Sequence, residues 1–245
     1  MTTKPSSLLI DEDVVVDQAP QSTASEQGTR AVARARKSPA DITREVFGRQ
    51  SVWRSTTKRA FDVLLAATLL VAFSPIIALI CIVVTVHLRR APLFLHERIG
   101  KNGVPFKCLK VRTMHENKAT EGLQPDPAFK SGTVSRTTAL TRLLRKTSLD
   151  ELPQLLNVLS GKMSLVGPRP VVAAELRMHY GELAPLLLVS KPGMTGLWMV
   201  AGRSTIEYPR RALIELKYVA ISSWWLDLRI LAQTIGAVLS RRGAY

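Results

Sequence analysis

The sequence predicts a helix-dominated α+β protein in which one apolar helix is embedded in a membrane and the rest of the chain forms a cytosolic domain. Residues 63–86 contain no charged side chain. Beyond residue 90, segments with alternating apolar residues precede segments with leucines at helical spacing. With 245 residues, 46% of them hydrophobic, the chain can bury a core, and its composition excludes a fully disordered chain and a polytopic transporter.

The charge balance predicts anionic partners. The 34 Lys and Arg residues against 19 Asp and Glu residues give a formal net charge of +15, which favours nucleic acid, phosphorylated substrates or an acidic membrane face. Cys81 and Cys108 are too few for a disulfide scaffold or a cysteine-based zinc ribbon. The four histidines contain no HxxxH pair, which excludes a zinc-hydrolase helix.

Residues 1–52 are expected to form a tail outside the folded domain. Residues 1–30 are polar and poor in aromatic side chains, a composition that predicts disorder, and they lack the features of a secretory signal. Basic residues dominate from residue 30 to residue 59. Beside an apolar segment, such a run is typical of juxtamembrane sequence that contacts anionic lipid.

Residues 53–90 are expected to form a re-entrant membrane helix. The uncharged residues 63–86 would form a helix about 36 Å long, against roughly 30 Å of hydrocarbon. Ser74 and Pro75 lie at its middle, and each half is too short to span a bilayer alone. Basic residues flank both ends, so the positive-inside rule assigns both ends to the cytoplasm. A kinked spanning helix is the alternative. The flanking bases are Arg54, Lys58, Arg59, Arg89 and Arg90.

Residues 91–245 are expected to form the cytosolic domain. Prolines, glycines and alternating apolar residues in 91–113 predict short strands and turns. A loop is predicted for residues 120–138. Apolar residues at helical spacing predict helices within three segments. These segments are 140–160, 171–189 and 208–239.

Asp150 and Glu151 are the strongest candidates for chemistry, because they are adjacent carboxylates in a strongly basic part of the chain. Pro153 belongs in the first turn of a helix, which makes Ser148 or Asp150 the predicted N-cap. A carboxylate at that position stays ionised against the positive end of the helix. Ser148 and Glu151 also form a capping-box pattern, so a purely structural role is the alternative.

Cations near this pair predict a phosphorylated substrate. Arg145 lies just upstream, Arg169 lies between two prolines, and Lys110 and Arg112 lie on a predicted strand. Arginine forks match phosphate oxygens, and Mg²⁺ commonly bridges a carboxylate and substrate phosphates. An ionised aspartate can also attack phosphorus.

Six segments carry a resemblance to a known family. On these segments, and over roughly residues 58–239, the sequence resembles the bacterial sugar transferases of the monotopic phosphoglycosyl transferase family, in the small form associated with exopolysaccharide synthesis. The segments, in order, are Lys58–Asp62, Ser74-Pro75, Glu97–Met114, Leu144–Pro170, Lys191–Arg203 and Trp225–Leu231.

The resemblance implies an enzyme of the bacterial inner membrane, with its catalytic domain on the cytoplasmic face. Such enzymes transfer a sugar-1-phosphate from a UDP-sugar to undecaprenyl phosphate and release UMP, and a Ser-Pro-broken re-entrant helix anchors them. By position, Asp150 would be the nucleophile that forms a covalent phosphosugar intermediate, and Glu151 would bind Mg²⁺. The implied substrate-binding residues are Arg145 for a phosphate, Pro168, Arg169 and Pro170 for the nucleotide, and Lys110 and Arg112 near the phosphates.

The resemblance also adds three further candidates, Arg203, Glu215 and Asp227. Glu215 stands where the family usually has an aspartate. The predicted partners are a UDP-sugar, undecaprenyl phosphate and membrane lipid, without nucleic acid, and a homo-oligomer is left open. The alternative function is a membrane-tethered basic module that binds nucleic acid or anionic lipid, which the 6% aromatic content disfavours.

Overall fold

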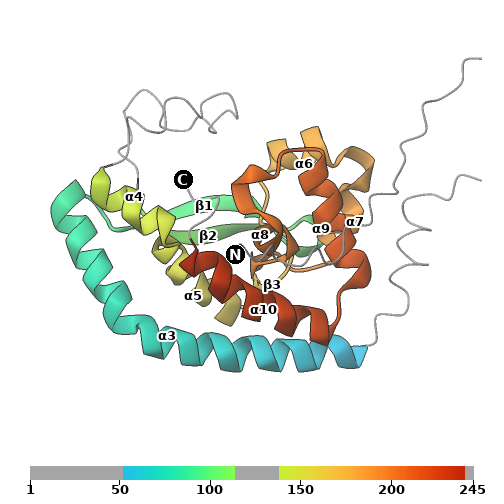
Figure 1. Cartoon of the computed structure of the whole chain (residues 1–245), viewed down its shortest axis with the longest axis horizontal. Helices are drawn as coiled ribbons and strands as arrows, with labels where there is room; N and C mark the ends of the chain where they lie inside the picture. The colour runs from blue at the N-terminus through green and yellow to red at the C-terminus, as the bar shows by residue number, and fades with distance from the viewer. Residues whose placement is uncertain (1–51, 114–137, 241–245) are drawn as a thin grey trace, which may run out of the picture. The chain divides into compact units, whose positions relative to one another are not determined.

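The computed structural model describes residues 52–113 and 138–240 (Figure 1). The tail predicted for residues 1–52 and the loop predicted for residues 120–138 lie almost entirely outside the described residues. The described chain is mainly helical with two small sheets, which confirms the helix-dominated α+β class. The α-helices are α3 (Val52–Leu88), α4 (Ala139–Lys146), α5 (Leu155–Leu159), α6 (Ala173–His179), α7 (Ala184–Leu188), α8 (Leu197–Ala201), α9 (Arg210–Ile221) and α10 (Trp224–Leu239). The strands are β1 (Leu93–Ile99), β2 (Pro105–Val111), β3 (Ser164–Val166) and β4 (Gly193–Thr195). The short 3₁₀ helices are η1 (Lys101–Gly103), η5 (Leu149–Gln154), η6 (Gly181–Leu183) and η7 (Arg203–Thr205).

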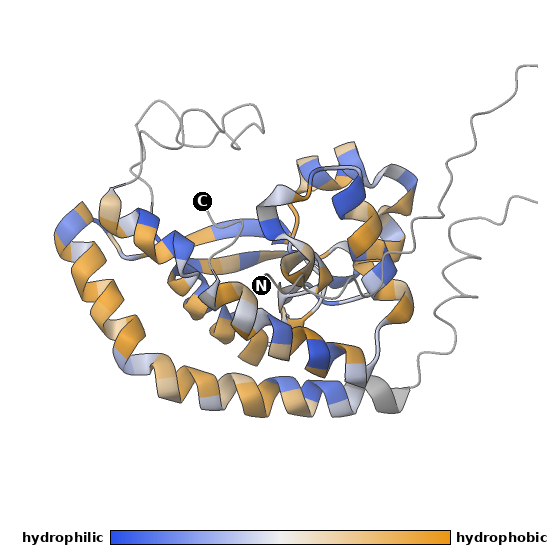
Figure 2. Ribbon diagram, in the orientation of Figure 1, coloured by the Kyte–Doolittle hydropathy of each residue, from blue (hydrophilic) through white to orange (hydrophobic). Residues whose placement is uncertain are grey.

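The predicted apolar helix is present as α3. Within it, Thr56–Leu88 is long and apolar enough to cross a membrane, and Figure 2 shows the hydrophobic colour along most of its length. The sequence suggested an interruption at Ser74-Pro75, but the helix runs without a gap through both residues, and its ribbon bends partway along (Figure 1). Proline removes only one helical hydrogen bond, and the bonds around it hold the helix together.

The two ends of α3 pack differently. Near its start, the buried Asp62 carboxylate accepts hydrogen bonds from Ser164 Oγ at 2.7 Å and from the Leu165 N–H at 3.2 Å. Arg59 donates to the carbonyls that end α5, at 2.6 and 2.8 Å. Toward its end, α3 instead buries apolar side chains in a small cluster with β2 and α4. That cluster contains Ile80, Val84, Leu88, Val111 and Leu144.

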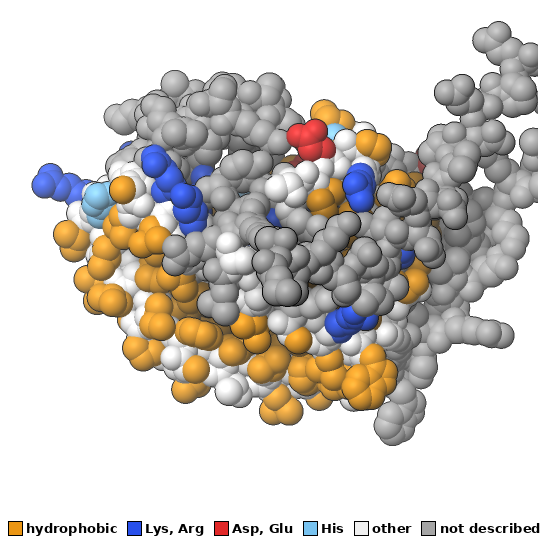
Figure 3. Space-filling model, viewed as in Figure 1, with side chains coloured by type: hydrophobic (Ala, Val, Ile, Leu, Met, Phe, Trp, Pro, Cys, Tyr) orange, Lys and Arg blue, Asp and Glu red, His pale blue; other side chains and the backbone are white. Residues whose placement is uncertain are grey.

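Many apolar side chains of α3 face outward. In Figure 3 they gather along the lower edge of the view, over the helix. Burial of such side chains is worth roughly 25 cal/mol per Å², so this surface favours an apolar environment. The exposed large residues of α3 are Leu64, Val71, Ile76, Leu79, Ile82, Val83 and Val86.

The predicted strands in 91–113 form an antiparallel hairpin, with Leu93 opposite Val111 and Ile99 opposite Pro105. The connection contains Asn102 and Gly103, whose φ angles are 57° and 78°. Asn and Gly tolerate this left-handed conformation, which closes the turn between the strands. The hairpin thereby brings side chains of two separate segments onto one face.

A second, parallel pair joins β3 to β4 and was not predicted from the sequence. The backbones approach so closely here that a Cβ on Gly193 would lie 2.1 Å from the Gly167 nitrogen. Glycine is therefore required at this crossing. The chain leaves β3 through Gly167 directly into the Pro168-Arg169-Pro170 segment. The pairing of β3 with β4 therefore fixes the position at which this segment starts.

Candidate active site

The carboxylate pair lies in a 3₁₀ helix rather than at the start of an α-helix. The predicted helical segment 140–160 divides into α4, η5 and α5, and η5 carries Asp150 and Glu151. Ser148 precedes η5 with φ at 57°, and its side chain makes no capping hydrogen bond. Ser148 thus occupies the predicted N-cap position, but the capping-box alternative is wrong because its side-chain hydrogen bond is absent and the backbone at Ser148 is left-handed rather than extended.

The surroundings of Asp150 disfavour the ionised form of its carboxyl group. Its side chain is buried, with 8% of the residue exposed. Burial, followed by the neighbouring charge of Glu151, raises the pKa of Asp150 from 3.8 to about 6. The positive charges of Lys110 and Arg145 act in the opposite direction. The carboxylate is thus ionised at neutral pH and more basic than an ordinary aspartate.

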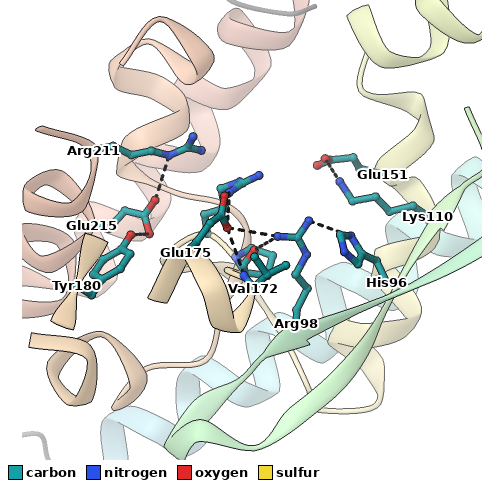
Figure 4. Close-up of polar contacts among 11 residues, drawn as sticks. His96, Arg98, Lys110, Glu151, Val172, Glu175, Tyr180, Arg211 and Glu215 are labelled. Atoms are coloured by element: carbon teal, nitrogen blue, oxygen red, sulfur yellow. Dashed lines mark hydrogen bonds and ion pairs between the residues drawn. The ribbon is translucent and has the colours of Figure 1, made fainter. Parts of the chain in front are cut away.

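Glu151 has the opposite surroundings. Its Oε1 accepts a hydrogen bond from Lys110 Nζ at 2.6 Å in an ion pair, which Figure 4 shows. Burial opposes ionisation, but Lys110, assisted by Arg169 and Arg203, outweighs it and lowers the pKa of Glu151 below its ordinary value. The two adjacent acids are therefore distinguished by their partners.

A network of ion pairs surrounds Arg169 in the segment after β3. Arg169 Nη1 donates to both carboxylate oxygens of Glu175, at 3.1 and 3.2 Å. Arg98 lies 3.6 Å from the same carboxylate and donates to the Pro170 carbonyl at 3.1 Å. These contacts tie the predicted nucleotide-facing segment to β1 and α6 (Figure 4).

His96 and Arg98 were missed by the sequence reasoning. In the hairpin register Phe94 faces Lys110 and His96 faces Cys108, so His96, Arg98 and Lys110 share one face. Arg98 Nη2 lies 3.0 Å from His96 Nδ1. Arginine can only donate, so Nδ1 accepts and the proton of a neutral imidazole is on Nε2. Burial and the charge of Arg98 accordingly lower the pKa of His96 to about 4. The alternation along the predicted strand was the signal that could have identified both residues.

The remaining predicted substrate-binding residues differ in their surroundings. Arg145, in the last turn of α4, is close enough to Asp150 to influence its pKa. Arg112 instead donates from Nε to the Ala91 carbonyl at 3.0 Å and stacks over the Phe94 ring, 5.4 Å from its centroid. Pro168 is buried, and its carbonyl accepts from the Gly193 N–H at 2.8 Å, which fixes the start of the Arg169 segment.

Glu215 lies in α9, and in Figure 4 the Glu175 network separates it from Glu151. It is 1% exposed, accepts from Tyr180 Oη at 3.0 Å, and lies 3.5 Å from Arg211 Nε. Burial raises the pKa of Glu215 to about 7, against the opposing charges of Arg211 and Arg169. The structure therefore places it in the arginine network, without a contact to Asp150 or Glu151 among the described side chains.

Asp227 belongs to a different cluster. Its carboxylate accepts hydrogen bonds from Lys58 Nζ and, at 2.7 Å, from Tyr218 Oη. These contacts join α10 to the start of α3 and to α9. Arg203, the third additional candidate, lies at the start of η7 and donates from Nη2 to Ser148 Oγ at 3.4 Å, two residues before Asp150.

The donor set restricts how a metal could bind. In residues 52–113 and 138–240, no group of three His, Cys, Asp or Glu side chains is arranged to hold a metal ion. Mg²⁺ does not need such a group, because it commonly binds one or two carboxylates and completes its shell with water and substrate phosphates. The adjacent carboxylates of Asp150 and Glu151, of which Glu151 is the more readily ionised, fit that kind of binding.

Sequence comparison assigns the chain to a family. The sequence model of the bacterial sugar transferases matches residues 53–241, which include all of α3 except its first residue, the carboxylate pair and the arginine network. The chain therefore belongs to the bacterial sugar transferase family and is a transferase.

Several curated relatives are similar to this chain. One is the exopolysaccharide production protein ExoY of Rhizobium meliloti, 43% identical over 207 residues, which cover 77% of this chain and 88% of the relative. The UDP-galactose-lipid carrier transferase of Erwinia amylovora is 43% identical over 199 residues, 77% of this chain but only 41% of the relative's own length. The UDP-glucose:undecaprenyl-phosphate glucose-1-phosphate transferase of Caulobacter vibrioides is 39% identical over 196 residues, 77% of this chain and 72% of the relative.

Proposed function

We propose that this protein is a membrane-bound phosphoglycosyl transferase that moves a sugar-1-phosphate from a UDP-sugar to undecaprenyl phosphate and releases UMP. The buried Asp150, with its raised pKa, beside the Lys110–Glu151 ion pair carries the proposal. The names of the Erwinia and Caulobacter relatives support the reaction class. The name of ExoY supports a role in exopolysaccharide production, and the proposed reaction would initiate the synthesis of such a polymer or of another glycoconjugate.

In the proposed first step, a carboxylate oxygen of Asp150 attacks the phosphorus that carries the sugar. A new P–O bond forms to Asp150, the P–O bond to the bridging oxygen breaks, and UMP leaves with that oxygen and its electron pair. In the second step, a phosphate oxygen of undecaprenyl phosphate attacks the same phosphorus. The bond to Asp150 breaks and the carboxylate is regenerated, which yields the sugar joined to the lipid through a diphosphate.

The surroundings support Asp150 rather than Glu151 as the nucleophile. Glu151 is engaged by Lys110 and is the weaker base, whereas Asp150 carries no such partner among the described side chains. Glu151 would hold Mg²⁺, which offsets phosphate charge when bound. Arg145 and Arg169 would bind phosphate oxygens of the substrates, because guanidinium groups match their geometry.

Because the proposed acceptor is a lipid, α3 would serve to anchor the domain at the membrane. We propose that α3 enters the membrane from the cytoplasmic face and returns to it, bent in the region of Ser74 and Pro75. Basic residues at both ends of the helix support this orientation. Its polar contacts at Arg59 and Asp62 hold the domain against the start of the helix, which would keep the catalytic carboxylates close to a lipid-bound phosphate.

A UMP-release assay tests the proposal. Purified protein in detergent is given undecaprenyl phosphate, Mg²⁺ and one of several UDP-sugars, including UDP-galactose and UDP-glucose. We expect UMP release with at least one sugar and loss of at least 1,000-fold in Asp150→Asn, roughly the cost of removing a covalent nucleophile. The exposed Glu182→Gln is the matched control and should retain activity. A folded, fully active Asp150→Asn variant would overturn the mechanism.

A further inference from the structure

Arg203 is a buried cation without an anionic partner among the residues that the structure describes. Only 5% of it is exposed, and its Nε has no hydrogen-bond partner within residues 52–113 and 138–240. The contact from Nη2 to Ser148 Oγ, at 3.4 Å, is long for a hydrogen bond. A buried guanidinium that lacks an anion is unfavourable, so an arginine held in this way indicates that a ligand completes its environment.

Two other cations of the site, Lys110 and Arg169, have anionic protein partners. Lys110 is paired with Glu151, and Arg169 is paired with Glu175. Arg203 is close enough to Glu151 for the two charges to influence each other, since each contributes to the pKa of the other. Among the described residues, the Nε of Arg203 is therefore an N–H donor without an acceptor, within the electrostatic reach of Glu151.

Arg203 and Ser148 both have an unusual backbone conformation. Arg203 has a φ of 54° and Ser148 has a φ of 57°, both in the left-handed region that side chains other than glycine rarely adopt. The two residues are 55 positions apart in the sequence, yet they contact each other beside η5. Strained backbone of this kind persists where the surrounding structure requires one side-chain direction, and ligand sites are a frequent case.

We propose that the Arg203 guanidinium binds a phosphate group of a substrate beside Asp150, with Ser148 Oγ positioning the guanidinium. This inference rests on the proposed function and names a further binding residue for it. The phosphate belongs either to the diphosphate of the UDP-sugar or to the lipid acceptor, because both must come near the Asp150 carboxylate.

Arg203→Gly is the informative variant. Glycine adopts a φ of 54° without strain, so this substitution removes the side chain while the backbone can keep its path. Arg89→Gly is the matched control, because Arg89 also has a positive φ, of 51°, but is exposed directly after α3. Thermal unfolding of both variants checks that they fold. Arg203→Lys keeps the charge and loses the planar fork, and Ser148→Ala removes the positioning hydroxyl.

Two half-reactions separate the two sources of phosphate. UMP release in a single turnover without acceptor depends on the donor diphosphate, and transfer to undecaprenyl phosphate depends on the acceptor. Loss of a hydrogen bond to a charged group corresponds to roughly 10- to 100-fold. A loss of this size in single-turnover UMP release in Arg203→Gly assigns the donor phosphate. The same loss confined to transfer assigns the acceptor phosphate. Ser148→Ala should show a smaller loss in the same half-reaction.

Equilibrium binding of UDP and of undecaprenyl phosphate makes the inference testable even if the proposed reaction fails. Wild-type protein that releases no UMP would count against the proposed function alone. In that case, weaker binding of either ligand by Arg203→Gly, compared with Arg89→Gly, still supports a phosphate site at Arg203. Unchanged affinity for both ligands, or unchanged rates in both half-reactions where these can be measured, in a folded Arg203→Gly protein overturns it.

Discussion

Asp150 and Glu151 are neighbours in the sequence, yet their carboxylates have opposite environments. Lys110 stabilises the charge of Glu151, whereas burial penalises the charge of Asp150. A pair of acids whose pKa values are pushed apart is typical of sites where the two groups perform different tasks. Here the separation is consistent with one nucleophile and one metal ligand.

The raised pKa of Asp150 predicts a pH dependence of stability with a definite sign. The folded-state pKa, about 6, lies above the ordinary value of 3.8, so the folded protein binds this proton more tightly than the unfolded chain. Stability from this group is complete below about pH 4 and is lost as the pH rises to about 6. Asp150→Asn lacks the charge and should escape this loss.

Unfolding temperatures measured between pH 4 and pH 8 check this prediction. The Asp150→Asn variant should unfold at a higher temperature than wild type at pH 8, and the difference should shrink as the pH falls through 6. Glu182→Gln, at an exposed acid, controls for the general effect of removing a charge. A difference that stays constant over the whole range would contradict the shifted pKa.

Polar anchors at one end and an apolar outer surface characterise α3 as an element. Asp62 and Arg59 bind the backbone around α5 and β3, while the outer side chains remain exposed. Pro75 lies inside the helix. A helix of this kind is compatible with entry into a membrane, and we expect the proline to influence its path there.

Cysteine labelling tests the re-entrant path. Single cysteines at Thr57 and Arg90, in a background in which Cys81 and Cys108 are alanine, mark the two ends of the apolar segment. We expect an impermeant maleimide to label neither position in spheroplasts and both after lysis. Pro75→Ala should restore a straight helix, which spans and exposes one end, because proline no longer removes its hydrogen bond. Labelling of one end in the protein with Pro75 intact would favour a kinked spanning helix.

Contacts between distant segments hold the described part of the molecule together. Asp227 on α10 joins Lys58 at the start of α3 to Tyr218 on α9. Lys58 also donates to the Val166 carbonyl of β3 at 3.0 Å. One carboxylate thus connects the long apolar helix α3 to the elements that position the Arg169 segment.

Asp227→Ala should destabilise the whole domain. The substitution leaves Lys58 and Tyr218 without their shared acceptor, at a cost of about 2 kcal/mol. For a chain of this size, that corresponds to roughly 4–8 °C in unfolding temperature, measurable by circular dichroism in detergent. Arg229→Gln, exposed on the same helix, is the control and should change little. An unaltered unfolding temperature in Asp227→Ala would show that the network does not stabilise the fold.

Much of the fold and part of the site could be predicted from local patterns. The uncharged residues 63–86 predicted the apolar helix, and the alternation of apolar residues in 91–113 predicted the strands that form the hairpin. Leucine spacing predicted helix in 140–160 but not its division, because the left-handed turn at Ser148 has no sequence signal as clear as a glycine. The three-residue strands β3 and β4 are too short to show a period.

By itself, the sequence determined the apolar helix, the adjacent acids, the basic surroundings and, through its motifs, the family. These features depend on residues near one another in the chain. Only the tertiary structure decided that Lys110 pairs with Glu151 across 41 positions and that Arg98 joins Arg169 through Glu175. It also decided that Arg203 lies beside Ser148, without an ion-pair partner among the residues that the structure describes. Pairing and desolvation depend on which distant segments pack together, and burial alone separates the pKa of Asp150 from that of an ordinary aspartate more than any neighbouring charge does.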